Sequence, residues 1–283
     1  MEFIKSPFNY IGNKYRIVQQ LTELFPRNIR VFVDLFCGGC DIAINTQAER
    51  ILANDINYHL VDILRTFKHN SPNAIFKYID STIAKWGLTK TDKAAYEQFR
   101  EHYNRTKNPL DLFILICHSF NHQFRFNEQH EFNTPFGCKR SSYNHSIRSN
   151  LEKMLQKLNN IVFTAVPFDE LDMSFLTEKD FVYADPPYLL TCGSYNDGKR
   201  GFKGWTARDD ARLLGMLSSL HARGVRFGLS NVLEHKGRRH AALEQWARNA
   251  GHGVYDMGQT YANCNYHARH GAGSTREVYI SNC

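Results

Sequence analysis

The sequence lacks any run of 18 apolar residues, and its opening stretch, MEFIKSPFNYIGNK, contains no apolar core of a signal peptide. The first absence excludes a membrane-spanning helix, and the second argues against a secreted protein. No internal repeat and no low-complexity tract is present either, so the fold has to be inferred from the order of the elements. We therefore expect a cytoplasmic protein with no membrane partner.

The cysteines form no regular framework. The chain has seven cysteines and 13 histidines, but only Cys37 and Cys40 form a C-x-x-C pair, and no H-E-x-x-H motif occurs. An odd cysteine count without a signal peptide is typical of a reducing compartment, and the second pair that zinc sites need is missing. We predict that the chain has no metal site; a redox role of the C-G-G-C pair is the alternative.

Charge of one sign dominates only mildly, because 35 Lys and Arg residues against 28 Asp and Glu residues give a net charge of +7. This basic balance favours a polyanionic partner. Aromatic residues make up 13% of the chain, and basic and aromatic side chains together suit a ligand with phosphates and flat bases. The composition therefore indicates a nucleic-acid partner.

The first 55 residues alternate between helical and strand patterns. The expected elements are a helix at 12–25, a strand at 30–36, a glycine turn at 38–39, a helix at 41–50 and a strand at 50–54. Asp55 follows the second strand directly. A strand, a glycine turn, a helix, a second strand and an acid form the βαβ unit of a parallel sheet.

The middle of the chain interrupts this pattern. It contains helical patterns at 58–105, 110–120 and 149–160, and a polar, aromatic loop or hairpin at 121–144. Strand patterns return at 161–166, 180–184, 225–231 and 275–281, with a helix at 209–224. We predict an α/β catalytic domain made of residues 1–56 and 161–283, with a second domain inserted at 57–160.

The tetrapeptide Asp185-Pro186-Pro187-Tyr188 follows the apolar strand pattern FVYA directly. Ligands of parallel sheets bind beyond the carboxyl ends of the strands. The prolines remove backbone donors, so the Pro186 carbonyl and the Asp185 carboxylate are two adjacent acceptors that match the amino group of a nucleobase. They can draw its nitrogen toward a pyramidal geometry, while Tyr188 offers a flat face to the ring. A rigid turn is the alternative; we predict that Asp185, Pro186 and Tyr188 are catalytic.

The glycine turn of FVDLFCGGCDIAIN is followed by the strand ILAND. Asp55 lies 17 residues after Gly38, and an acid at the end of the second strand commonly accepts hydrogen bonds from ribose hydroxyls. The absence of G-x-G-x-x-G favours a single-nucleoside cofactor over a dinucleotide. Asp34 is either a structural cap or a partner for the amino-acid end of that cofactor. With D-P-P-Y, the pattern indicates a nucleoside-bearing methyl donor beside a nucleobase acceptor.

Three further segments have a functional and a structural interpretation. In FNYIGNK, Tyr10 can pack on a ring and Lys14 can meet a carboxylate, although an ordinary helix start gives the same pattern. Four basic residues are candidates for phosphate contacts or for a solvated loop: Lys199, Arg200, Lys203 and Arg208. Tyr195 and Trp205 either line a pocket or pack in the core. The run KGRRH, which ends at His240, is expected to be solvated surface.

FNYIGNK, FVDLFCGG, LANDI, EFNTPFG and DPPY occur in the order of the Dam-type DNA adenine-N6 methyltransferases. The chain resembles this family over essentially its whole length, and the Dam enzymes of T-even bacteriophages most of all. The resemblance implies an α/β fold with a Rossmann-like sheet of S-adenosylmethionine-dependent methyltransferases. It also implies an inserted helical plus β-hairpin DNA-recognition domain. The substrate would be double-stranded DNA containing GATC, methylated by a monomer in a bacterial or phage-infected cell.

The resemblance also implies residue roles. S-adenosylmethionine would be contacted by Tyr10, Lys14, Asp34, Phe36, Gly38, Asp55, Phe168 and Asp185. DNA would be contacted by Phe120, Asn121, Gln123, Arg125 and Arg140. Phe120 matches an aromatic that inserts where the target base leaves the stack, or alternatively closes the core of the preceding helix. Asn9 stands where cellular Dam enzymes carry a base-reading lysine.

Other substrates remain as alternatives. Cytosine-N4 methyltransferases tend to carry Ser at the position of Asp185, and many RNA enzymes carry Asn. Asp185 and the long insertion therefore favour adenine in DNA. A DNA-binding protein without activity is the alternative from another class, and the intact Asp55 and Asp185 argue against it.

Overall fold

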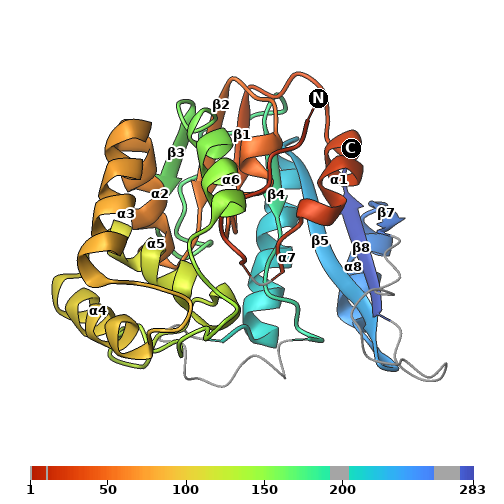
Figure 1. Cartoon of the computed structure of the whole chain (residues 1–283). Helices are drawn as coiled ribbons and strands as arrows, with labels where there is room; N and C mark the ends of the chain where they lie inside the picture. The colour runs from red at the N-terminus through yellow and green to blue at the C-terminus, as the bar shows by residue number, and fades with distance from the viewer. Residues whose placement is uncertain (1, 11, 192–203, 258–274) are drawn as a thin grey trace.

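The computed structural model describes residues 2–10, 12–191, 204–257 and 275–283. Its centre is a mixed sheet (Figure 1) in the order β3-β2-β1-β4-β5-β8-β7, with β6 paired to β5. The strands are β1 (Val31–Asp34), β2 (Arg50–Asn54), β3 (Ile161–Thr164), β4 (Phe181–Ala184), β5 (Arg226–His235), β6 (Arg238–Arg239), β7 (Gly253–Asp256) and β8 (Thr275–Ser281). Strands β3, β2, β1, β4 and β5 run parallel, whereas β8 is antiparallel to β5 and β7.

Helices cover both faces of this sheet. They are α1 (Val18–Leu24), α2 (Tyr58–His69), α3 (Pro72–Trp86), α4 (Lys93–Thr106), α5 (Pro109–His118), α6 (His145–Leu155), α7 (Ala207–Ala222) and α8 (Ala241–Asn249). Three short 3-10 turns are η1 (Tyr15–Ile17), η2 (Ala43–Asn45) and η3 (Phe120–His122). Among the described residues, no helix is both long and apolar enough to cross a bilayer.

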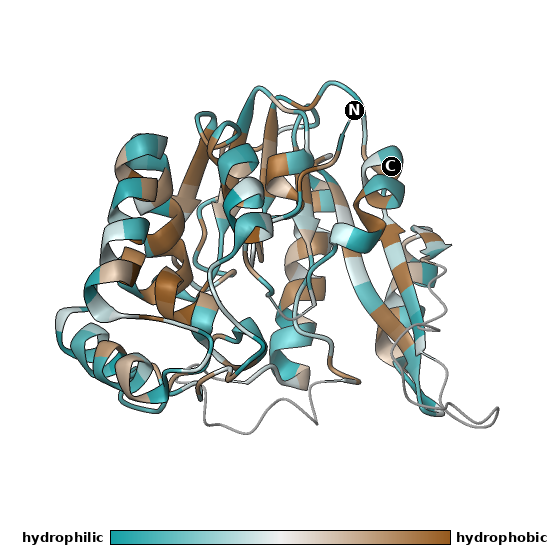
Figure 2. Cartoon of the chain, viewed as in Figure 1, coloured by the Kyte–Doolittle hydropathy of each residue, from teal (hydrophilic) through white to brown (hydrophobic). Residues whose placement is uncertain are grey.

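Alternating side chains of the buried strands divide between two cores. Phe32 of β1 belongs to a core shared with α1 to α6, whereas its neighbours Val31 and Val33 belong to a core beneath α7 and α8. This alternation follows from the two-residue period of a strand. Figure 2 shows hydrophobic residues concentrated in the strands and in α5, where nine of the ten residues, Leu110 to His118, are buried. The predicted α/β layering is therefore confirmed.

Helices α2 to α6 follow β2 and precede β3 in the chain, and α2 to α5 gather on the β3 side of the molecule (Figure 1). Helix α5 packs against α2, α3 and α4. These helices share one continuous hydrophobic core with the sheet. The division at residues 57–160 into a recognition domain stays a prediction, since the packing does not separate this segment by a core of its own.

The expected helix at 41–50 is wrong, because this segment forms only the 3-10 turn η2. Its polar groups are used elsewhere: the Asn45 amide donates to the Ile4 carbonyl at 2.7 Å, and the Ile4 N–H donates to Asn45 Oδ1 at 2.8 Å. Asp41 likewise accepts from the Ser6 N–H at 2.8 Å. Asn and Asp side chains that bond to distant backbone in this way compete with helix formation. The turn consequently fixes the N-terminal segment against the sheet.

Candidate functional site

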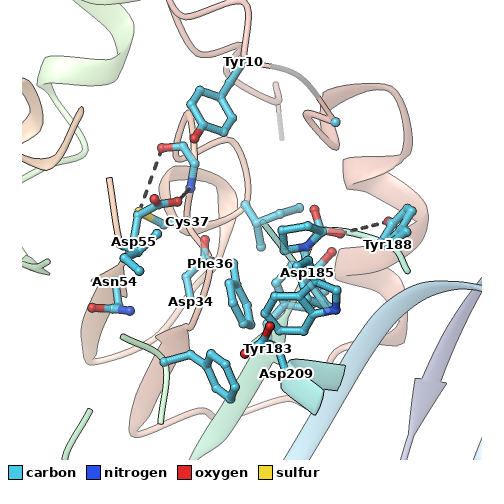
Figure 3. A pocket seen from close by; sticks show the side chains of 18 of the residues that line it. Tyr10, Asp34, Phe36, Cys37, Asn54, Asp55, Tyr183, Asp185, Tyr188 and Asp209 are labelled. Carbon is cyan, nitrogen blue, oxygen red and sulfur yellow. Dashed lines mark hydrogen bonds between the residues drawn. The ribbon is translucent and has the colours of Figure 1, made fainter. Parts of the chain in front are cut away.

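A deep pocket of the described structure lies where the strand order reverses. Strand β2 lies on one side of β1 and β4 on the other, and ligands of open α/β sheets bind at such a switch point, beyond the carboxyl ends. The pocket has a volume of about 830 Å³ and is lined from these strand ends and from the N-terminal segment (Figure 3). Sequence-predicted residues in its lining are Tyr10, Lys14, Asp34, Phe36, Gly38, Asp55, Phe168, Asp185, Pro186 and Tyr188.

The glycine turn forms one wall of the pocket and is held by Asp55. Gly38 has a φ of +45°, and a Cβ at this position would lie 2.9 Å from Cδ1 of Tyr10. Asp55 Oδ2 accepts from the Gly38 N–H at 2.9 Å, and Oδ1 accepts from the Asn57 N–H at 2.8 Å. Burial raises the pKa of Asp55, and these two N–H groups oppose the rise. Asp55 therefore has a structural role, and its role toward a ribose stays a prediction.

Asp185 is part of a compact charged cluster at the end of β4. Its Oδ2 lies 2.7 Å from Lys14 Nζ, and its Oδ1 accepts from the Tyr188 hydroxyl at 2.9 Å. Lys14 Nζ also lies 5.1 Å from the centre of the Tyr188 ring. Burial raises the pKa of Asp185, and the Lys14 ammonium opposes the rise. The carboxylate thus lies in the pocket wall with a fixed orientation.

Glu277 of β8 completes this cluster and was missed by the sequence analysis. Its Oε1 accepts from the Tyr188 hydroxyl at 3.0 Å and lies 3.7 Å from Lys14 Nζ. The segment TREVYIS was correctly predicted to be a strand, but nothing local indicates that this acid reaches a site whose other members lie about 90 residues or more earlier in the chain. The sequence signal is weak, because Glu277 shares its strand face with Thr275, Tyr279 and Ser281 and so interrupts no apolar stripe.

Asp34 is the most unusual acid of the pocket. It is 1% exposed, and neither carboxylate oxygen has a hydrogen-bond partner among the described residues. Burial and the charges of Asp185 and Asp55 raise the pKa of Asp34 well above its usual value. The N–H of Ala43 opposes the rise without reaching hydrogen-bond geometry. A buried acceptor without a partner is costly, so this carboxylate is suited to a cationic or hydrogen-bond-donating ligand. The capping interpretation of Asp34 is not supported.

Three aromatic side chains form another part of the pocket wall. The rings of Phe36, Phe168 and Trp205 lie 5.5 to 5.6 Å from one another. The Trp205 indole N–H donates to Asp210 Oδ1 at 3.4 Å, and His240 Nε2 lies 2.9 Å from Asp210 Oδ2.

His240 is 5% exposed, which corrects the expectation of solvated surface for this residue. Its Nδ1 accepts from the Leu243 N–H at 3.2 Å and so caps α8. With Nδ1 accepting, Nε2 carries the proton and donates to Asp210. Helix α8 and this cap were not predicted from the sequence, and KGRRH lies partly in β6. The buried histidine therefore supports the aromatic wall through Asp210.

The C-G-G-C pair shows no feature of a redox centre. Cys37 and Cys40 are both buried and free. The contact with Cys40 and burial raise the pKa of Cys37 well above its usual value. Because the thiolate is the reactive form, this environment disfavours thiol chemistry.

The residues predicted to contact DNA lie outside the pocket, on the segment that follows α5. Short antiparallel bridges join Ser119 to Phe136 and Phe126 to Phe132, so the segment folds back on itself. Phe120 is 42% exposed, which does not support a role in closing the core of α5. Asn121 and Arg140 are exposed, and Gln123 and Arg125 are half-buried. The Asn9 amide donates to the Asn121 carbonyl at 3.1 Å and connects the N-terminal segment to this hairpin.

Part of the predicted basic loop lies outside the described residues, namely Lys199, Arg200 and Lys203, and so does Tyr195. Arg208 is exposed at the start of α7. Trp205 lines the pocket.

Relatives of the chain include modification enzymes of bacteria. "Modification methylase StsI" of Streptococcus sanguinis is 43% identical over 283 residues, covering 99% of this chain and 43% of the relative. "Type II methyltransferase M.FokI" of Planomicrobium okeanokoites is 42% identical over 282 residues, covering 99% of this chain and 43% of that relative. The "DNA adenine methylase" of Escherichia coli K12 is 24% identical over 226 residues, covering 78% of each chain. The chain thus spans 43% of the length of its two type II relatives.

These similarities correct the predicted likeness to T-even phage Dam enzymes. The two modification enzymes match at 42–43% identity, far above the 24% of the Escherichia coli DNA adenine methylase. The solved structure of "Human methyltransferase 10 domain containing protein" covers 95% of this chain and 80% of its own, at 12% identity and a TM-score of 0.35, which is too distant to support an argument. Residues 10–257 match the model of the D12 class N6 adenine-specific DNA methyltransferases, and the chain belongs to this family.

Proposed function

We propose that the chain transfers a methyl group from S-adenosylmethionine to the N6 atom of an adenine in duplex DNA, as the methyl-transferring part of a restriction-system modification methylase. The observation that carries this proposal is the position of Asp185-Pro186-Pro187-Tyr188, at the carboxyl end of β4 and in the wall of the switch-point pocket. Membership of the D12 class and the names of the two type II relatives support it.

The pocket fits the methyl donor that the family implies. S-adenosylmethionine supplies an activated methyl group on a positively charged sulfur. The unpartnered Asp34 carboxylate matches a cationic ligand group, and the aromatic wall matches a flat ring. Each Asp55 oxygen accepts one backbone N–H and keeps a lone pair for a ligand hydroxyl. We assign the donor to this pocket, with Tyr10, Lys14, Phe36, Gly38 and Phe168 completing its contacts.

The adenine would be held by the residues at the end of β4. An amine whose lone pair is delocalised into a ring is a poor nucleophile, and acceptors at its N–H groups counter that delocalisation. The Asp185 carboxylate is such an acceptor, and the adjacent Pro186 and Pro187 contribute no N–H that would compete for it. The Tyr188 ring, held by its hydroxyl at Asp185, would support the base. As the methyl group leaves the donor sulfur and bonds to N6, the donor would become the neutral thioether and one N6 proton would pass to the Asp185 carboxylate.

A base inside a duplex cannot reach such a pocket, so the target adenine must leave the stack. The exposed Phe120 is suited to fill the gap that it leaves. We propose that Asn121, Gln123, Arg125 and Arg140 read neighbouring bases from the same hairpin, with Asn9 beside them. The GATC target and monomeric action rest on the motif resemblance alone, and the type II relatives do not support GATC.

Nucleoside mass spectrometry tests the proposal. Unmethylated plasmid DNA incubated with the purified chain and S-adenosylmethionine should gain N6-methyladenine. Gain of N4-methylcytosine would reassign the target base. Unchanged DNA, together with measurable binding of the donor and of DNA, would instead indicate a binding protein. Methylation-aware sequencing of the same product would give the recognition sequence.

A further inference from the structure

Glu277 lies behind the catalytic tetrapeptide rather than in the pocket. Lys14, Asp185 and Tyr188 belong to the pocket lining, whereas Glu277 does not belong to it among the described residues. Its carboxylate nevertheless contacts two of these three side chains, the Tyr188 hydroxyl at 3.0 Å and the Lys14 ammonium at 3.7 Å. The side chain is 10% exposed, so it is well shielded from water. Strand β8 thus supplies a second carboxylate to the site.

The two carboxylates compete for the same hydrogen-bond donors. The Tyr188 hydroxyl has one proton but lies within hydrogen-bond distance of both Asp185 Oδ1 and Glu277 Oε1. Lys14 Nζ is similarly placed between Asp185, at 2.7 Å, and Glu277, at 3.7 Å. One cation and two carboxylates leave the ionised cluster with a net charge of −1. Without Glu277, the Lys14 ammonium and the Tyr188 hydroxyl would interact with Asp185 alone.

We propose that Glu277 is a positioning residue for methyl transfer, which shares Lys14 and the Tyr188 hydroxyl with Asp185 and thereby keeps Asp185 a strong hydrogen-bond acceptor for the amino group of the target base. The proposal rests on the proposed function, since it assigns Asp185 to that amino group. A carboxylate whose charge is fully neutralised by a lysine and a phenol accepts weakly from a further donor. Glu277 prevents the full neutralisation of Asp185, and it does so from outside the pocket that the substrate would occupy.

The proposal has a defined pH signature. Titratable groups that face Asp185 come from every neighbouring element: Lys14 from the N-terminal segment, Asp34 from β1, Tyr183 from β4, Tyr188 from its own loop and Glu277 from β8. Of these, the Glu277 charge raises the pKa of Asp185, and the Tyr188 hydroxyl lowers it. Removing the two groups one at a time should therefore move the acidic limb of the kcat profile in opposite directions.

The test compares Glu277→Gln and Tyr188→Phe with the wild-type chain. Glu277→Gln keeps an acceptor for the Tyr188 hydroxyl but removes the charge. We expect kcat to fall roughly tenfold, the KM values for S-adenosylmethionine and DNA to stay within about twofold, and the acidic limb to move to lower pH by roughly one unit. Tyr188→Phe should move that limb to higher pH. Glu277→Asp, which keeps the charge, should restore the wild-type limb.

Glu234→Gln is the matched control. It removes the same charge from β5, where Glu234 pairs with Arg276, the neighbour of Glu277, and should leave kcat and the pH profile unchanged. Should the Gln variant fail to fold, Glu277→Ser removes the same charge with a smaller side chain and is expected to give the same shift. An acidic limb that stays in place without the Glu277 charge, or that moves in the same direction in Tyr188→Phe, overturns the proposal.

A readout without catalysis separates this inference from the proposed function. The carboxyl carbon of Asp185 can be followed by NMR in ¹³C-aspartate-labelled protein, assigned with Asp185→Asn. The pKa of Asp185 should fall in Glu277→Gln relative to the wild type. A wild-type chain that methylates no DNA would refute the proposed function, while this titration would still decide whether Glu277 controls Asp185.

Discussion

Asp34 has the environment of a ligand-binding group rather than of a structural one. A carboxylate with no partner, buried at the end of β1, destabilises the folded chain when it is ionised. Proteins retain such groups where a ligand uses them, and the neighbouring charges of Asp185 and Asp55 increase the cost further. Affinity for a cationic ligand and stability of the free protein are therefore opposed at this residue.

We predict that Asp34→Asn leaves the melting temperature at neutral pH unchanged or raises it, while it weakens S-adenosylmethionine binding about 10- to 100-fold, the scale of a hydrogen bond to a charged group. Because the pKa of Asp34 is raised in the folded chain, the ionisation penalty is absent below the unfolded pKa of about 4 and grows as pH rises toward the folded value. The stability difference between variant and wild type should therefore widen with rising pH.

Calorimetric titration with the donor and thermal melts at several pH values measure both effects. Asp41→Asn is a useful control: burial raises the pKa of Asp41 to about 6, but its carboxylate accepts from the Ser6 N–H. It should lose stability where Asp34→Asn does not. If Asp34→Asn bound the donor with unchanged affinity, Asp34 would have no role in donor binding.

At the scale of elements, the start of α8 supports the start of α7 and, through it, the aromatic wall. His240 caps α8 and donates to Asp210, which is buried in the first turn of α7 and accepts from Trp205. The pocket wall therefore depends on a contact between the starts of two helices.

Trp205 gives an optical test of this wall. The chain has three tryptophans, and of these only Trp205 lines the pocket within the described part of the chain. S-adenosylmethionine should change the tryptophan emission of the wild type, of Trp86→Phe and of Trp246→Phe, but not that of Trp205→Phe. Trp205→Ala should lose about 0.5–1.5 kcal/mol of donor binding, the contribution of an aromatic contact. An emission change that persists in Trp205→Phe would place the donor elsewhere.

The hairpin after α5 is the element on which DNA specificity is expected to depend. A bidentate arginine–guanine pair contributes roughly 1–3 kcal/mol of discrimination, whereas a phosphate contact weakens binding almost evenly across sequences. Once the target sequence is known, sites with one substituted base can be compared with the cognate site. The difference in methylation rate between them should be smaller for Arg140→Ala than for the wild type. Arg125→Ala should relax a different position.

Lys139→Ala is the control for this prediction, since Lys139 is the exposed neighbour of Arg140 in the chain. It should lower the salt dependence of binding without changing the order of preferred sites. Equal loss of activity of both arginine variants on every sequence, at fixed salt, would make the arginines phosphate contacts and move base reading to another surface.

At the scale of the whole molecule, local sequence patterns predicted what depends on neighbours in the chain. The strands that carry Asp55 and Asp185 follow from short apolar runs, and the parallel sheet follows from their alternation with helices. The helix expected at 41–50 failed because the partners of Asn45 and Asp41 are backbone groups of residues 4 and 6, a contact that periodicity does not encode. Glu277 was missed for the same reason.

Burial also separated residues that looked alike in the sequence. His240 belongs to a basic run that predicts solvated surface, yet it is buried, with a hydrogen bond to Asp210 and a capping position at α8. Phe120 and Phe113 are both aromatic residues of one apolar run, yet the first is exposed and the second is fully buried. The motifs thus predicted residues that line one pocket, whereas the supporting contacts required the three-dimensional packing.

The central claim is that Asp185, at the carboxyl end of β4, accepts from the amino group of the target adenine. The most direct measurement is the single-turnover rate of methyl transfer to duplex DNA by the wild type and by Asp185→Ala, with donor and DNA affinities measured on both. Lys14 keeps Glu277 as a partner in the variant, so the variant should fold and bind. We predict a rate at least ~10²–10³-fold lower with affinities near those of the wild type. A variant that methylates adenine at close to the wild-type rate would contradict the account.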